Sequence, residues 1–139
     1  MKEYNSVSEP FLADVRAVVG DANVFTEPEK LEQYKTDEEY DPRRFHVPEA
    51  VVRPANAEEI AAVVKLCNKY NVPLTVRSGG TSLADGAIAV CGGIVLLMER
   101  LNKIIEMNTE AMYVVAEAGV RTVCLLYTSP SPRDGLLSR

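Results

Sequence analysis

Short apolar runs in the middle of the chain predict β-strands. Each run has the length of a strand and ends near Pro or Gly, which interrupt regular structure. The run at 92–98 is apolar throughout, which is typical of a strand with both faces covered. The predicted strands are residues 49–54, 72–77, 92–98 and 112–119.

A helix is predicted between the first two of these strands, at residues 56–71. Asn56 is a suitable N-cap, and Glu58 and Glu59 lie at the positive end of the helix dipole. Strand, helix and strand in this order predict a right-handed βαβ crossover with a parallel strand pair. The expected apolar stripe of the helix consists of Ile60, Val63, Val64 and Cys67, with Ala61 and Leu66 at its margins.

Local signals also predict the structure of the segments before and between these strands. Ser8 as N-cap, Pro10 in the first turn and Gly20 as a stop predict a helix near the N-terminus. Residues 27–39 predict a short helix followed by a loop, and residues 99–111 read as a connector.

Composition narrows the class of protein. The chain has 139 residues, a formal net charge of −5 and 47% hydrophobic residues, so it is not a basic nucleic-acid-binding protein. Three cysteines without regular spacing and a single histidine argue against a disulfide framework or a metal site. With no signal peptide and no apolar run of membrane-spanning length, we expect a soluble cytoplasmic protein with Cys67 as a buried thiol.

The loop after the second strand carries the candidate chemistry. In "LTVRSGGTSLADGA" (74–87), closely spaced glycines allow a ligand to approach the backbone amides, which can form an anion-binding nest. Ser78, Thr81 and Ser82 add hydroxyl donors, and Arg77 either adds a cation or braces the turn. These donors suit a diphosphate, although an ordinary surface loop has the same composition. The loop matches neither a P-loop nor a G-x-G-x-x-G fingerprint.

An ordered set of residues runs from the first predicted strand through the loop: Val51, Val52, Pro54, Glu59, Pro73, Arg77, Gly79, Gly80, Thr81, Ser82, Leu83, Gly86 and Ala87. The segment "GGIVLLMERLNKIIEMNTEAMYVVAEAGV" (92–120) follows it. With these residues, the stretch 25–122 resembles the FAD-binding domain of vanillyl-alcohol-oxidase type (PCMH-type) flavoproteins. The similarity is greatest to the glycolate oxidase D-subunit and D-lactate dehydrogenase branch.

This resemblance implies an α+β fold, with a small parallel sheet flanked by helices and the start of a second subdomain. It also implies FAD as cofactor, with loop 77–83 around the diphosphate and Pro54 on the flavin side. Thr81 stands where covalent-flavin relatives carry a histidine, which favours non-covalent FAD. Asp85 departs from the pattern, because it places a carboxylate near the expected phosphates. The implied cofactor-binding residues are Pro54, Arg77, Ser78, Gly79, Gly80, Thr81, Ser82, Leu83 and Gly86.

By the same resemblance, the intact relative oxidises a 2-hydroxy acid of the glycolate or D-lactate type to a 2-oxo acid and uses a partner subunit or electron acceptor. We assign no catalytic residue and expect this chain alone to be inactive. His46 is expected to be structural or exposed. The arginines Arg43, Arg44 and Arg53 are expected to face solvent.

The C-terminal segment departs from the family pattern. "CLLYTSPSPRDGLLSR" (124–139) contains Ser-Pro-Ser-Pro, which is incompatible with the helix expected there. We therefore expect a helical lead at 1–24, a partial FAD-binding domain at 25–123 and an out-of-family tail that reflects truncation or a frameshift. Two alternatives stay open: a non-catalytic ADP- or nucleotide-binding module, and a flavoprotein similar to UDP-N-acetylenolpyruvoylglucosamine reductase.

Overall fold

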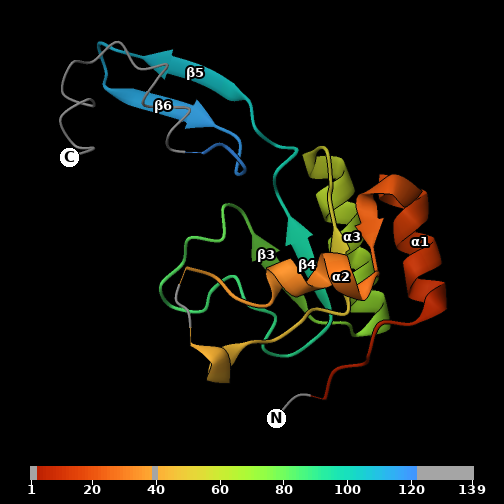
Figure 1. Ribbon diagram of the computed structural model, residues 1–139. Coiled ribbons are helices and arrows are strands. Elements are labelled where there is room, and N and C mark those ends of the chain that lie inside the picture. The colour runs from red at the N-terminus through yellow and green to blue at the C-terminus, as the bar shows by residue number, and fades with distance from the viewer. Residues whose placement is uncertain (1–2, 39–40, 122–139) are drawn as a thin grey trace.

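The computed structural model describes residues 3–38 and 41–121 (Figure 1). The helices are α1 (Glu9–Val19), α2 (Pro28–Leu31) and α3 (Ala57–Tyr70), with 3₁₀ turns at Asp21–Asn23, Glu32–Tyr34 and Pro42–Arg44. The strands are β1 (Val24–Phe25), β2 (Ala50–Val52), β3 (Leu74–Arg77), β4 (Ile94–Leu97), β5 (Ile104–Asn108) and β6 (Tyr113–Ala116). The predicted tail at 124–139 lies outside the described residues.

A four-stranded sheet with the order β1-β2-β4-β3 forms the centre of the fold. Both β2 and β3 run parallel to β4, whereas β1 is antiparallel to β2. In this register, Val95 of β4 lies between Val51 of β2 and Thr75 of β3. The expectation that β2 and β3 form a pair was wrong, because β4, which is buried along its whole length, occupies the central position between them.

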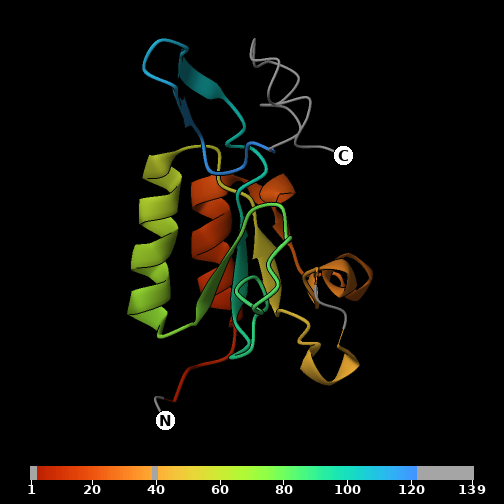
Figure 2. The same cartoon turned by 90° about the vertical axis from the view of Figure 1, so that its left-hand side faces the viewer.

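Both faces of the sheet are covered. Helices α1 and α3 pack side by side on one face, and α2 lies on the other (Figures 1 and 2). On the first face, Phe11 and Val15 of α1 meet Val63 of α3 in one buried cluster with the sheet. On the second face, Leu31 of α2 belongs to a smaller cluster. The α+β fold with a small sheet flanked by helices is therefore confirmed.

The predicted helix ends are confirmed, but the buried face of α3 is rotated from the predicted stripe. The Asn56 side chain accepts a hydrogen bond from the Glu59 amide at 2.9 Å, as expected of an N-cap. Val63 and Cys67 are buried, whereas Val64 is 38% exposed. At about 100° per residue, a face centred between Val63 and Cys67 excludes Val64 and includes Tyr70, which packs against the core.

The segment 99–111, which we expected to be a connector, contains strand β5. It pairs antiparallel with β6 in a separate two-stranded sheet, with Met107 opposite Val114 and an irregular register near Ile104. The strand was missed because its side chains are half-buried or exposed and lack a regular apolar alternation. Its strand character depends on pairing with β6, which sequence periodicity does not reveal.

A narrow neck joins this hairpin to the sheet, and we define the neck as residues 99–103 and 117–121. The Gly119 amide donates to the Leu101 carbonyl at 2.8 Å. A Cβ atom at Gly119 would lie 2.0 Å from the Met98 carbonyl oxygen, so the close approach of the two strands requires glycine. None of the helices in residues 3–38 and 41–121 is long and apolar enough to cross a membrane.

Candidate functional site

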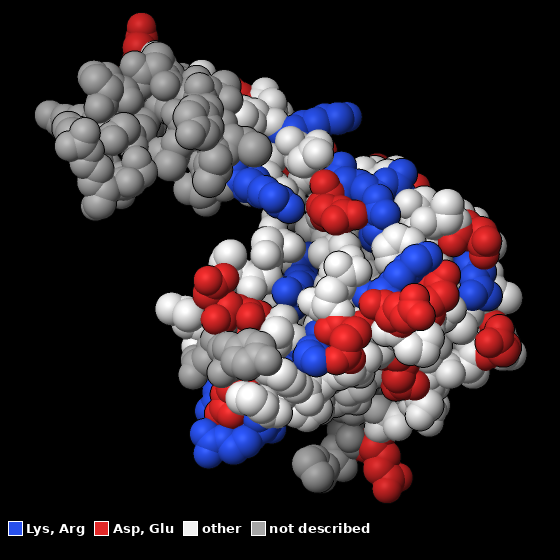
Figure 3. Space-filling model, viewed as in Figure 1, with Lys and Arg blue, Asp and Glu red and all other residues white. Residues whose placement is uncertain are grey.

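A hollow of about 640 Å³ lies beside the loop that follows β3. This position, at the carboxyl end of a parallel strand, is where open α/β sheets commonly hold ligands. The space-filling view shows the molecule hollowed between the sheet and the neck, with basic side chains at the neck (Figure 3). The hollow is lined by Val76, Ser78, Gly79, Gly80, Thr81, Ser82, Gly86, Ala87, Val120 and Arg121.

The backbone of the loop is open to a ligand. Within the described part of the chain, the amides of residues 78–83 donate to no acceptor. A Cβ atom at Gly79 would meet nothing closer than 3.9 Å, so the loop surface there is not crowded. Because a buried amide without a partner is costly, such a row is kept where solvent or a ligand accepts its hydrogen bonds. This arrangement suits an anion.

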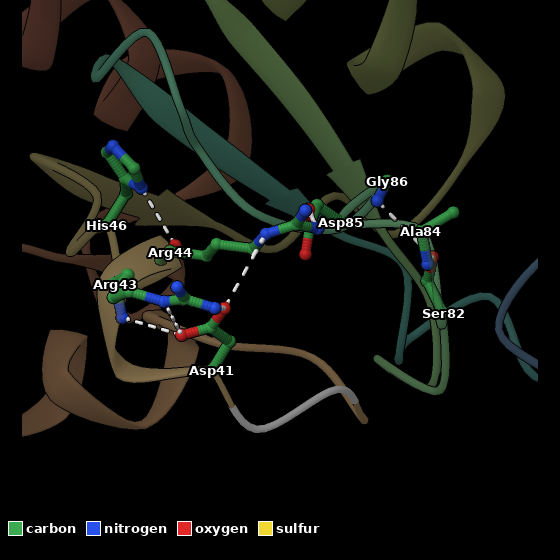
Figure 4. A network of polar contacts seen from close by, with 8 residues as sticks. All are labelled: Asp41, Arg43, Arg44, His46, Ser82, Ala84, Asp85 and Gly86. Atoms are coloured by element: carbon green, nitrogen blue, oxygen red, sulfur yellow. Dashed lines mark hydrogen bonds and ion pairs between the residues drawn. The ribbon is translucent and has the colours of Figure 1, made fainter.

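Ser82 has a hydroxyl group with one hydrogen-bonding role left. Its Oγ accepts from the Ala84 amide at 3.2 Å and from the Gly86 amide at 3.3 Å (Figure 4). Since a hydroxyl has two acceptor lone pairs and one proton, only the proton remains available. Ser82 lines the hollow, so it favours a ligand that accepts a hydrogen bond, such as a phosphate oxygen.

Arg77 braces the loop from behind. Its Nη1 atom donates to the Thr36 carbonyl at 2.7 Å and to the Ala87 carbonyl at 3.4 Å. Gly80 has a φ of +71°, and a Cβ atom there would lie 2.3 Å from Arg77 Nη2. Burial lowers the pKa of Arg77 below its usual value, and nearby Asp37 opposes this shift. The residue is not part of the lining of the large hollow.

The Asp85 carboxylate, which departs from the family pattern, is paired with a cation. Arg44 forms an ion pair with it and reaches across from the Pro42–Arg44 turn (Figure 4). Asp85 also has a φ of +57°, a left-handed conformation that Asp tolerates better than most residues. The carboxylate is thus neutralised by a neighbouring side chain rather than left free beside the loop.

The other basic residues considered in the sequence are Arg43, His46 and Arg53, and each contacts a nearby polar group. Arg43 holds Asp41 through contacts of 2.8 to 3.2 Å, which lower the pKa of that carboxyl group. His46 is exposed, as expected, with Nδ1 2.8 Å from the Arg44 carbonyl. Arg53 does not simply face solvent, because it pairs with Glu99 at 2.7 Å and its side chain is only 28% exposed.

The structure brings most of the predicted loop residues together, but not all of them. Ser78, Gly79, Gly80, Thr81, Ser82 and Gly86 line the hollow. Leu83 is 70% exposed and lies outside its lining. Pro54 is fully buried in the core and also lies outside the lining, so it does not reach this hollow.

Two lining residues, Val120 and Arg121, come from the far side of the hairpin and were missed. They follow β6, about 40 residues after the loop along the chain. The Ser78 hydroxyl donates to the Ala118 carbonyl at 2.6 Å and so fixes the neck against the loop. A pattern within 74–87 contains no signal for this contact. Among the described residues, no group of three or more His, Cys, Asp or Glu side chains is placed to hold a metal ion.

The comparison with protein families decides the assignment. A family described as "FAD binding domain" matches residues 48–125, which is more than half of the chain. This chain belongs to the FAD binding domain family. The resemblance drawn from the ordered residues across 25–122 to an FAD-binding domain is therefore confirmed.

Similar proteins extend this result. Glycolate oxidase subunit GlcD of Bacillus subtilis (strain 168) is 33% identical over 85 residues, 61% of this chain and 18% of that protein. A D-lactate dehydrogenase of Anaerostipes hadrus is 38% identical over 73 residues, 52% of this chain and 15% of that protein. The crystal structure of p-cresol methylhydroxylase with substrate bound matches with a TM-score of 0.73 and 27% identity, over 88% of this chain and 25% of that chain.

These matches also show how much of each relative the chain covers. The chain spans under a fifth of the length of either curated relative. The family match begins within the predicted 25–123 segment and runs two residues beyond it. The open amides, the Ser82 proton and the uncrowded glycine all fit a dinucleotide with a diphosphate bridge.

Proposed function

We propose that the hollow beside residues 78–86 binds the diphosphate of FAD and that the intact enzyme oxidises a 2-hydroxy acid. The observation that carries the first part is the row of loop amides that find no acceptor among residues 3–38 and 41–121, next to a hydroxyl with only its proton left to donate. FAD supplies the redox chemistry by accepting electrons from the substrate. The role of this chain is to bind and orient the cofactor.

The residues of the loop have distinct parts in this proposal. The amides of residues 78–83 and the Ser82 hydroxyl bind phosphate oxygens, and Arg77 keeps the loop in shape. Arg44 holds the Asp85 carboxylate so that it does not repel the cofactor. Pro54 supports the sheet from within the core, because its side chain is fully buried. We assign no catalytic residue.

The substrate class rests on the curated relatives. Glycolate and D-lactate, which appear in the names of two relatives, are both 2-hydroxy acids. The name of p-cresol methylhydroxylase offers a phenolic substrate as the competing class. An assay of the full-length protein with glycolate, D-lactate and p-cresol separates these classes. Turnover of p-cresol alone would reject the 2-hydroxy acid proposal.

The cofactor proposal is tested on the purified chain by titration with FAD and with ADP. We expect both to bind, because both carry the diphosphate. Ser82→Ala should weaken both by about tenfold, which corresponds to the loss of one charge-assisted hydrogen bond. Ser8→Ala is the matched control, because the Ser8 side chain makes no capping hydrogen bond. Absence of binding of either ligand to the wild-type chain would reject the proposed site.

We further propose that FAD is held non-covalently, since Thr81 carries no ring nitrogen for attachment to the flavin. Acid precipitation of the loaded chain should release all of the flavin into the supernatant. Flavin absorbance that stays with the precipitated protein would contradict this proposal.

A further inference from the structure

Arg121 occupies a central position in the cleft around the loop. It lines the hollow of about 640 Å³ and also two smaller hollows, of about 250 Å³ and about 520 Å³. The large hollow and the 250 Å³ hollow share Ser78 and Gly79 as well as Arg121, so they adjoin along the loop. A side chain at this junction has room to turn toward the loop amides.

Charge singles out Arg121 among the residues around the large hollow. Every other described residue of its lining is uncharged. A diphosphate is anionic, and a guanidinium group binds its oxygens with good geometry. The loop amides supply neutral donors, and Arg121 is the nearest available source of positive charge from the lining.

The other basic residues near the loop are already engaged. The Arg77 guanidinium donates to the Thr36 and Ala87 carbonyls and lies against Gly80. Arg77 lines the 250 Å³ hollow but not the large one. Arg44 is paired with Asp85. Moving either side chain to a ligand would leave a carbonyl or a carboxylate without its partner, which costs free energy.

Within the described residues, Arg121 has no partner that would lose a bond if its side chain turned toward a ligand. It makes no hydrogen bond or ion pair with another residue in 3–38 or 41–121. The backbone just before Arg121 is nevertheless held in position. The Gly119 amide donates to the Leu101 carbonyl, and the Ala118 carbonyl accepts from the Ser78 hydroxyl. The neck therefore presents a cation that is unpaired within the described part of the chain, and the loop holds the neck in position.

We propose that Arg121 contacts the diphosphate of FAD and provides the positive charge of the site, while Arg77 acts only as a brace for the loop. This inference rests on the proposed cofactor site. It assigns a binding role to a residue of the neck, outside the loop motif, and so couples cofactor binding to the seating of the hairpin.

The test compares four forms of the chain: wild type, Arg121→Gln, Arg121→Lys and Lys65→Gln. Lys65 is an exposed residue of α3 and controls for the loss of one positive charge from the whole protein. Dissociation constants are measured by calorimetry for FAD, ADP and riboflavin, which has no phosphate, at low and high salt. Circular dichroism of each variant checks that the fold is retained.

We expect Arg121→Gln to weaken FAD and ADP about tenfold, or about 1.4 kcal/mol. The loss should shrink at high salt, because screening weakens the ion pair in the wild type. Riboflavin affinity should be unchanged, and Arg121→Lys should retain part of the binding. If Arg121→Gln binds FAD and ADP as Lys65→Gln does, the role of Arg121 is refuted while the loop site stands. If the wild type binds neither ligand, the site itself is wrong, and this inference with it.

Discussion

Gly80→Ala is the substitution that most directly probes the brace behind the loop. Gly80 has a φ of +71°, and its added Cβ atom would lie 2.3 Å from Nη2 and 2.6 Å from Cζ of Arg77. Two costs therefore arise at one position: a left-handed backbone for an L-residue and displacement of a guanidinium group that holds the loop.

The size of the effect follows from these two costs. The left-handed conformation costs an alanine about 1–2 kcal/mol. Displacement of Arg77 breaks its 2.7 Å hydrogen bond to the Thr36 carbonyl, which adds about 1.5–3 kcal/mol for a bond from a charged donor. Since the loop relaxes in part, we expect the free energy of unfolding to fall by about 2–4 kcal/mol.

Urea unfolding at 25 °C, followed by far-UV circular dichroism, measures this change. Gly79→Ala is the matched control, because its Cβ atom would meet nothing closer than 3.9 Å. The control should lie within about 0.5 kcal/mol of the wild type. FAD titration of the same proteins shows whether the loop amides keep their arrangement, and we expect Gly80→Ala alone to lose affinity.

A double substitution sharpens the test. In Arg77→Ala/Gly80→Ala the clash is absent, and the Arg77 hydrogen bond is lost only once. The sum of the losses in unfolding free energy of the two single variants should therefore exceed the loss in the double variant by about 1.5–3 kcal/mol. Equal destabilisation by Gly79→Ala and Gly80→Ala, or additive single effects, would refute the packing of Arg77 against Gly80.

Three further outcomes are expected. Asn56→Ala should lower the free energy of unfolding by about 1 kcal/mol in a urea titration, since it removes the cap of α3, and no change would contradict that role. Arg44→Ala should weaken FAD binding by exposing the Asp85 carboxylate, and the Arg44→Ala/Asp85→Ala double variant should recover it; a titration that shows no recovery would exclude the neutralising role. Burial raises the pKa of Cys67 to about 11, so its thiolate is scarce at pH 8. Iodoacetamide should therefore label exposed Cys91 faster than Cys67, as peptide mass spectrometry would show. Equal labelling rates would contradict the burial of Cys67.

Local signals were sufficient for β2, β3, β4, α1 and α3, whereas the two-residue strand β1 at the edge of the sheet was not predicted. A wholly apolar run identified β4, because a strand covered on both faces needs no polar position. Asn56 marked the start of α3, because a cap acts on amides within the next turn. The loop residues of the site were found for a similar reason, because glycines act through their own backbone and the Ser82 hydroxyl binds amides within the next four residues.

Features that depend on distant parts of the chain could not be read in this way. The apolar content of residues 104–108 is not regular enough to reveal β5, which exists through its pairing with β6. Arg77 left two roles open in the sequence, and its hydrogen bond to the Thr36 carbonyl, which supports the brace, comes from a residue 41 positions away. Arg121 lies beyond a hairpin from the loop, so its place at the hollow follows from the neck and not from its neighbours in sequence.

The position of β4 between β2 and β3 has a consequence for biosynthesis. Strand β3 has no partner in the sheet until residues 94–97 have been translated and have left the ribosome. Until then, β2 and β3 of a nascent chain lack the strand that joins them into one sheet. Such an intermediate exposes apolar surface that chaperones bind. Translation arrested before residue 94 should yield protease-sensitive chains, whereas arrest that leaves β4 outside the exit tunnel should yield protected ones.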